Sequence, residues 1–115
     1  MTIENNQEYI LCAAWWFKDI PVVRKLENNV RPFNCDRGIV FSGWRHPQCL
    51  YQMVSLTGLP QHETGENIEG FLTSKNRFVD RKEGAEIAIK AKQIIDNPRH
   101  SFNQNKLYSE DLYLL

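Results

Sequence analysis

The sequence predicts an α+β domain with a small antiparallel or mixed sheet and two main helices. Short apolar blocks bounded by glycine or turn residues indicate strands at 9–17, 38–43 and 69–73. Helical periodicity is present near 47–56 and 81–95. Because the strands do not alternate regularly with long helices, this order argues against a doubly wound parallel sheet.

Length and composition indicate one soluble domain, spanning 1–115. Apolar residues make up 42% of the chain, which is enough to fill a core. Fourteen Lys and Arg residues balance fourteen Asp and Glu residues, and this zero net charge argues against binding to a nucleic-acid polymer or an anionic membrane. Low net charge also gives little protection against self-association, and we expect a homo-oligomer.

The cysteine pattern and the N-terminal residues indicate a cytoplasmic protein with reduced thiols. Cys12, Cys35 and Cys49 are odd in number and irregularly spaced, which is not typical of a disulfide framework. Residues 1–8 are polar and contain no apolar segment typical of a secretion signal. The longest apolar run, 9–17, is about half the length that a membrane helix needs.

The individual elements follow from local signals. The block 9–17 is short and aromatic, which favours a buried strand over a helix. An irregular loop is expected over 22–31, between two prolines. The first helix, 47–56, begins with a proline in its first turn and is stopped by Gly58. A polar loop separates it from the strand at 69–73.

The second half of the chain predicts a hairpin, a helix and a tail. Turn residues at 74–76 lead to a short returning strand at 77–79. Asp80 is a strong N-cap candidate because Glu83 follows three positions later, and the helix is expected to run from 81 to about 95. The apolar residues of 107–115 are expected to dock on the core or on a neighbouring subunit.

Two strand-to-helix turns are candidates for anion binding. In the first, Gly43 permits close backbone approach, Arg45 is a bidentate donor suited to phosphate, and His46 opens the helix. Trp44 then either stacks on a base or caps the core. The structural alternative is that Trp44 is a core residue, Arg45 pairs with an acid and His46 caps the helix.

The second turn runs over 75–81 and again precedes a helix N-terminus. It offers Asn76, Arg77 and Arg81 around an anion, with Phe71 or Phe78 available to stack on a base. The alternative interpretation is a capped helix that follows a solvated basic turn, with Phe78 in the core.

Metal binding and catalysis are only weakly indicated. His46 and Cys49 form an H-x-x-C pair without any C-x-x-C motif, and Cys49 is better explained as a small buried residue. The acidic segment 108–111 is expected to cap the tail or pair with Arg77 and Arg81, and less readily to bind a ribose hydroxyl. We therefore expect no cofactor, no metal and no catalytic residue.

Four segments resemble a family of short phage and prophage proteins, some of which are similar to the first type of anti-Thoeris sponge: ILCAAWWF, IVFSGWRHPQCL, EGFLTSKNRFVDRKEGAEIAIKAKQI and LYSEDLY. The resemblance implies an oligomeric α+β protein that binds a phosphate-rich nucleotide without cleaving it. The contacts that it implies are Arg45, His46, Phe71, Asn76, Arg77 and Arg81. Gly84 and Lys92 depart from the pattern, the first where alanine is usual and the second where glycine often ends the helix.

The sequence thus leads to one main hypothesis and two alternatives. The main hypothesis is a phage protein that sequesters a cyclic ADP-ribose isomer or a cyclic oligonucleotide in the host cytoplasm and so inhibits antiphage defence. One alternative is a protein–protein interaction module that uses the aromatic N-terminal strand and the apolar tail. The other is a small enzyme acting on a nucleotide.

Overall fold

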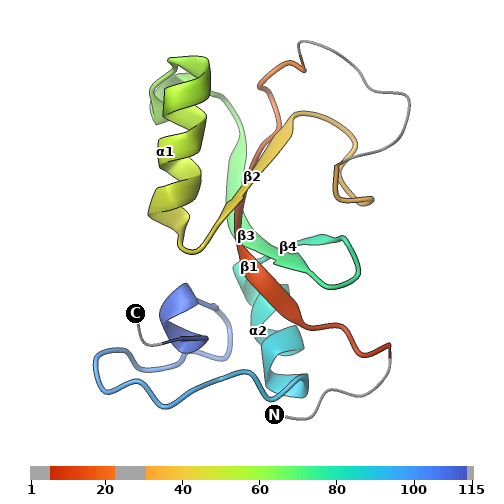
Figure 1. Cartoon of the computed structure of the whole chain (residues 1–115), viewed down its shortest axis with the longest axis vertical. Helices are drawn as coiled ribbons and strands as arrows, with labels where there is room; N and C mark the ends of the chain where they lie inside the picture. The colour runs from red at the N-terminus through yellow and green to blue at the C-terminus, as the bar shows by residue number, and fades with distance from the viewer. Residues whose placement is uncertain (1–5, 23–30, 114–115) are drawn as a thin grey trace.

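The computed structural model describes residues 6–22 and 31–113 and contains a four-stranded antiparallel sheet in the order β2-β1-β3-β4 (Figure 1). The elements are β1 Ile10–Phe17, β2 Ile39–Gly43, α1 His46–Thr57, β3 Asn67–Thr73, β4 Phe78–Asp80 and α2 Arg81–Lys90, with one-turn helices at Gln61–Glu63 and Ser109–Asp111. The predicted α+β class is confirmed, and the sheet is antiparallel.

The central strand β1 supplies the core because its side chains alternate between two apolar faces. Ala13, Trp15 and Phe17 point to the face that α1 and α2 cover and join the larger buried cluster. Ala14 is buried on the opposite face, in a smaller cluster to which Trp16 adds. An aromatic strand that is buried on both sides explains why this block shows no polar alternation.

The smaller face is partly covered by the segment that precedes β2. Cys35 is buried there against Phe78. The side chain of Asn34 accepts a hydrogen bond from the Phe78 N–H at 2.8 Å and donates to the Phe78 carbonyl at 2.6 Å. These two bonds attach the segment to the outer edge of β4. Most of the predicted loop over 22–31 lies outside the described residues.

Helix α1 agrees with the prediction to within a residue at each end. It starts at His46, with Pro47 in its first turn. It stops at Gly58, which has a φ of +73° and donates its N–H to the Val54 carbonyl. Glycine adopts this left-handed conformation without steric cost, so a local signal is sufficient to end the helix here.

Helix α2 is shorter than predicted. Asp80 caps it as expected, because its carboxylate accepts the Glu83 N–H at 2.8 Å. The helix was expected to reach about residue 95, but it ends at Lys90. Lys92 has a φ of +57°, and the side chain of Gln93 bonds to both the N–H and the carbonyl of Ile10. The hydrogen bonds of Gln93 to β1 therefore favour a helix that ends earlier than its apolar stripe predicts.

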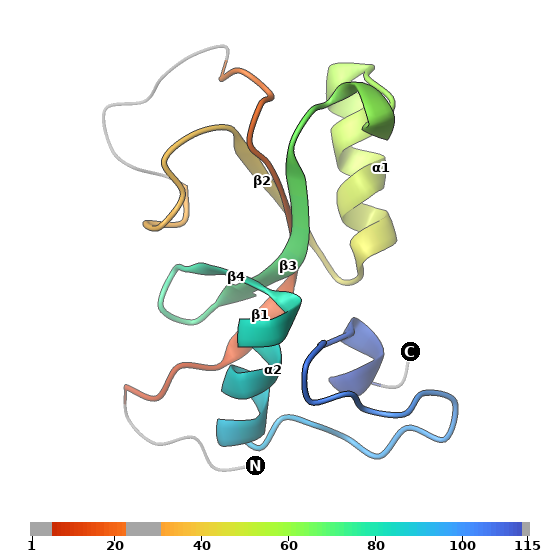
Figure 2. The ribbon, with the colours of Figure 1, turned by 180° about the vertical axis from the view of Figure 1, so that it is seen from behind.

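The C-terminal segment returns to its own core. Both ribbon views place it beside α2 and below the start of α1 (Figures 1 and 2). Leu107 is fully buried, and its N–H donates to the Arg81 carbonyl. The predicted docking of the tail is confirmed for Leu107, whereas Leu114 and Leu115 lie outside the described residues. Within those described residues, no helix is long and apolar enough to cross a membrane.

Candidate functional site

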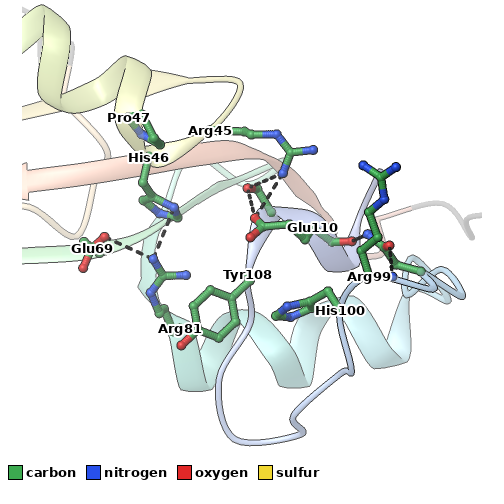
Figure 3. Close-up of a pocket in the computed structure, with 11 residues that line it drawn as sticks. Arg45, His46, Pro47, Glu69, Arg81, Arg99, His100, Tyr108 and Glu110 are labelled. Atoms are coloured by element: carbon green, nitrogen blue, oxygen red, sulfur yellow. Dashed lines mark hydrogen bonds and ion pairs between the residues drawn. The ribbon is translucent and has the colours of Figure 1, made fainter. Parts of the chain in front are cut away.

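A pocket of about 670 Å³ lies where the start of α1, the start of α2 and the C-terminal segment meet (Figure 3). This volume is within the range of small-molecule sites in proteins. The pocket brings together side chains that are up to 65 positions apart in the sequence. It is lined by Arg45, His46, Pro47, Glu69, Arg81, Asn97, Arg99, His100, Tyr108, Ser109 and Glu110.

Arg45 immediately precedes α1 and connects this helix to the tail. Its Nη1 donates to the Ser109 hydroxyl and to Glu110 Oε1, both at 3.0 Å. Its guanidinium also lies over the rings of Trp44 and Tyr113, at 4.8 and 5.0 Å from their centroids. Arg45 therefore pairs with an acid, as the structural alternative required, and it also lines the pocket.

Trp44 is exposed and is not a core residue, contrary to the structural alternative. Its ring stacks on Tyr113 with centroids 5.4 Å apart and planes 14° apart. The Tyr113 hydroxyl donates a hydrogen bond to the Trp44 carbonyl. This aromatic pair attaches the tail to the turn before α1, and it lies outside the pocket lining.

His46 is buried, and both of its ring nitrogens have partners. Nε2 is 2.8 Å from the Gly70 carbonyl, and Nδ1 is 3.3 Å from Arg81 Nη2. A carbonyl only accepts and a guanidinium only donates, so the neutral ring with its proton on Nε2 satisfies both contacts. Burial, with a contribution from the nearby Arg81 charge, lowers the pKa of His46. His46 therefore joins α1 to β3 and α2.

Arg81 forms the opposite wall of the pocket. Nη1 donates to the Leu107 carbonyl at 2.7 Å, and Nη2 donates to Glu69 Oε1 at 3.1 Å. The guanidinium lies 4.5 Å from the centroid of the Tyr108 ring. Two of the predicted ligand contacts, Arg45 just before α1 and Arg81 at the start of α2, thus face one pocket (Figure 3).

Arg99 and His100 complete the pocket, and the sequence interpretation did not find them. They were assigned to a polar stretch after a helix, where no local pattern marks them. The Nε2 atom of His100 is 3.2 Å from Oδ1 of Asp111, an arrangement that forms an ion pair when the ring is protonated. Asp111 is fully buried, and this burial raises its pKa.

Arg77 belongs to a different cluster. Its Nε and Nη2 each donate to the Glu8 carboxylate at 2.9 Å, and Nη2 also donates to Glu83 at 2.9 Å. The hydrogen bonds from Arg77 outweigh the effect of burial and lower the pKa of Glu8. Arg77 therefore attaches the segment before β1 to α2, and it does not line the pocket.

The other two predicted contacts are also outside the pocket lining. Phe71 is fully buried, and its ring contacts His46 edge to face, with centroids 5.2 Å apart. Asn76 occupies the turn between β3 and β4 with a φ of +57°. Of the six predicted contacts, the structure brings together Arg45, His46 and Arg81.

The acidic segment 108–111 pairs differently from the prediction. Glu110 forms its ion pair with Arg45, and not with Arg77 or Arg81 as one of the two favoured uses required. The side chain of Asp111 accepts the Tyr108 N–H at 2.8 Å and so caps the last turn, as one of the predicted uses required. Glu69, which comes from β3, supplies the acid for Arg81.

Cys49 belongs to the buried core and does not line the pocket. Cys49 is buried, and this burial raises its pKa to about 12, so its thiolate is scarce near neutral pH. Among the residues that the structure describes, no three His, Cys, Asp or Glu side chains are grouped to hold a metal ion.

Residues 9–113 match the model of one protein family, whose description is phage T4 y16D protein. No curated protein matches the chain significantly, and no solved structure does so either.

Proposed function

This chain belongs to the phage T4 y16D protein family, and from that premise we propose that it is a phage protein that binds a phosphate-bearing nucleotide in the pocket and does not convert it. The proposed biological role is to sequester a host signalling nucleotide in the host cytoplasm and so inhibit antiphage defence. The observation that carries the proposal is the convergence of Arg45, Arg81 and Arg99 on one pocket.

The charges of the pocket favour an anionic guest. Three guanidinium groups line it together with the carboxylates of Glu69 and Glu110. The side chains of Arg45 and Arg81 are only 17% and 13% exposed, so water screens their charges less than it screens a surface pair. A guanidinium donates to two oxygens of one phosphate at once, which makes phosphate a better partner than a halide or a neutral sugar.

His46 and Cys49, the two residues that the sequence offered for catalysis, are poorly placed for turnover, and Cys49 does not line the pocket. His46 uses one nitrogen on the Gly70 carbonyl and the other on Arg81, so neither nitrogen is aimed at a guest. The raised pKa of Cys49 disfavours a thiolate nucleophile. A protein that sequesters a signal needs affinity alone, which the arginines supply.

Calorimetry with ADP-ribose, cyclic ADP-ribose isomers and cyclic oligonucleotides tests the proposal. Arg99→Ala is the variant of choice because Arg99 is exposed, and within the described chain no ion pair joins it to an acid. We expect binding by the unaltered protein and at least about tenfold weaker binding by Arg99→Ala.

The matched control is Arg37→Ala. Arg37 is also exposed, but it pairs with Asp19 and Glu66 away from the pocket, so its loss is expected to leave the affinity unchanged. Equal affinity of both variants, or no binding of any of these nucleotides, contradicts the proposal. A new product peak in chromatography of the nucleotide would instead favour the small-enzyme alternative.

A second candidate function is binding to a host protein. The aromatic strand that was expected to serve it is the inner strand β1, and Leu107 of the tail is also buried, so the outer surface of α1 favours this function instead. Tyr51 and Leu56 are highly exposed on this helix, although both are large apolar residues. A stable partner that copurifies with the unaltered protein but not with Leu56→Asp, and without a nucleotide, would favour this function.

A further inference from the structure

The two acids of the pocket hold their arginines in the same loose way. Glu110 Oε1 is 3.0 Å from Arg45 Nη1, and Glu69 Oε1 is 3.1 Å from Arg81 Nη2. In the hydrogen bonds among the described residues, each carboxylate contacts its guanidinium through Oε1, and the two side chains are 45% and 42% exposed. The arginines are largely buried while the carboxylates face the solvent, so each acid can turn away while its arginine stays in place.

The ion pair outside the pocket is built differently. Arg77 binds both oxygens of Glu8, each at 2.9 Å, and the Glu8 side chain is only 17% exposed. The Thr73 hydroxyl donates to the same carboxylate at 2.6 Å, as the Ser109 hydroxyl does to Glu110 at 2.9 Å. The two kinds of pair therefore differ in the number of carboxylate oxygens used and in burial. Two-oxygen contact with burial is typical of a structural ion pair, whereas one-oxygen contact with exposure contributes little to stability.

A phosphate group competes well for the pocket arginines. It offers more acceptor oxygens than the single oxygen that Glu110 gives to Arg45, and it binds a guanidinium through two hydrogen bonds. A pyrophosphate also carries more negative charge than one carboxylate, so the exchange gains Coulomb energy while the released acid returns to water. A singly charged carboxylate guest gains no such advantage over Glu110.

We propose that Glu110 and Glu69 bind Arg45 and Arg81 in the empty pocket and that the anionic groups of the guest displace them. This exchange makes the pocket select multiply charged phosphates, above all a pyrophosphate, over singly charged anions. This inference rests on the proposed function. It assigns the two acids a role in selectivity, because singly charged guests do not displace them.

The test uses inorganic pyrophosphate and acetate as probes in calorimetry of the full chain. Glu110→Gln and Glu69→Gln keep the side-chain size and remove the competing charge. We expect each to bind pyrophosphate about tenfold tighter than the unaltered protein. Acetate is expected to gain measurable binding only in these two variants.

Glu83→Gln is the matched control. Glu83 resembles Glu110 in its exposure, 46% against 45%, and in its distance to an arginine, 2.9 Å against 3.0 Å. It pairs, however, with Arg77 outside the pocket. Its affinity for pyrophosphate is expected to equal that of the unaltered protein.

A measurement on the unaltered protein does not depend on the folding of the variants. Pyrophosphate should shift the side-chain carboxyl ¹³C resonances of Glu110 and Glu69 and leave that of Glu83 in place. Absence of these shifts in a protein that binds pyrophosphate overturns the exchange, as does equal or weaker binding by both glutamine variants.

The outcomes also separate this inference from the proposed function. A nucleotide that binds without any displacement of Glu110 or Glu69 leaves the proposed function intact and refutes the exchange alone. Tighter binding of pyrophosphate by both glutamine variants than by the unaltered protein supports the exchange. If neither the unaltered protein nor the variants bind pyrophosphate or ADP-ribose, the inference and the proposed function both fail.

Discussion

Replacing Arg77 with alanine separates a structural role from a role in ligand binding. The change removes hydrogen bonds to both oxygens of Glu8 and one to Glu83. Glu83 is half-exposed, so its bond contributes little. Glu8 is mostly buried and loses its counter-charge, which costs about 2 kcal/mol, within the range for hydrogen bonds to charged groups.

This loss converts to a measurable shift in melting temperature. An unfolding entropy of ~2.1 cal/mol/K per residue, over a chain of 115 residues, gives about 4 °C for each kcal/mol. We therefore expect Arg77→Ala to melt about 8 °C lower in a tryptophan-fluorescence scan. Its affinity for pyrophosphate should stay within about twofold of the unaltered protein, because Arg77 does not line the pocket.

The pH dependence of this difference has a definite sign. The pKa of Glu8 is lowered in the folded protein, so the stability that it contributes is complete above its ordinary value of 4.5. It is lost as the pH falls through the lower folded-state value. The gap between Arg77→Ala and the unaltered protein should therefore close in acid.

The opposite result would refute this reasoning. An Arg77→Ala protein that melts normally but no longer binds nucleotide would show that Arg77 contacts the guest, as the family resemblance implied. Arg37→Ala again serves as the control, because it removes an exposed arginine that pairs with half-exposed acids. It should shift the melting temperature by no more than about 2 °C.

Three further predictions concern single positions. The lowered pKa of His46 means that stability falls as the pH drops below 6.5, by up to about 1.4 kcal/mol per pH unit, because only the unfolded ring takes up a proton. Urea titrations between pH 5 and 8 should show this slope reduced in His46→Gln, a comparison that cancels the contributions of the groups common to both proteins. Lys92→Gly should raise the melting temperature by about 4 °C, because it relieves a left-handed lysine with a φ of +57°; an unchanged scan would contradict this. Gly84→Ala should gain nothing in the same scan, since its Cβ would lie 3.2 Å from Phe71 and 3.3 Å from Leu107, and this crowding offsets a helix-propensity gain of about 1 kcal/mol.

Local signals were sufficient for most of the fold. The aromatic block of β1, the stop at Gly58 and the cap at Asp80 each depend on residues within a few positions, and all three predictions are confirmed. The predicted end of α2 was wrong because Gln93 bonds to Ile10. This contact joins residues 83 positions apart, so helical periodicity in the sequence does not reveal it.

The candidate site required the tertiary structure. The sequence indicated Arg45 and Arg81 as anion ligands from their places before and at helix starts, but it gave no indication of Arg99 or His100. Nor did it show that Arg77 pairs with Glu8, 69 positions away, while Arg45 pairs with Glu110, 65 positions away. Helix caps and strand periods depend on neighbours along the chain, so a sequence specifies them directly. Which acid neutralises which arginine depends on distances that exist only after the tail has folded back between the two helices.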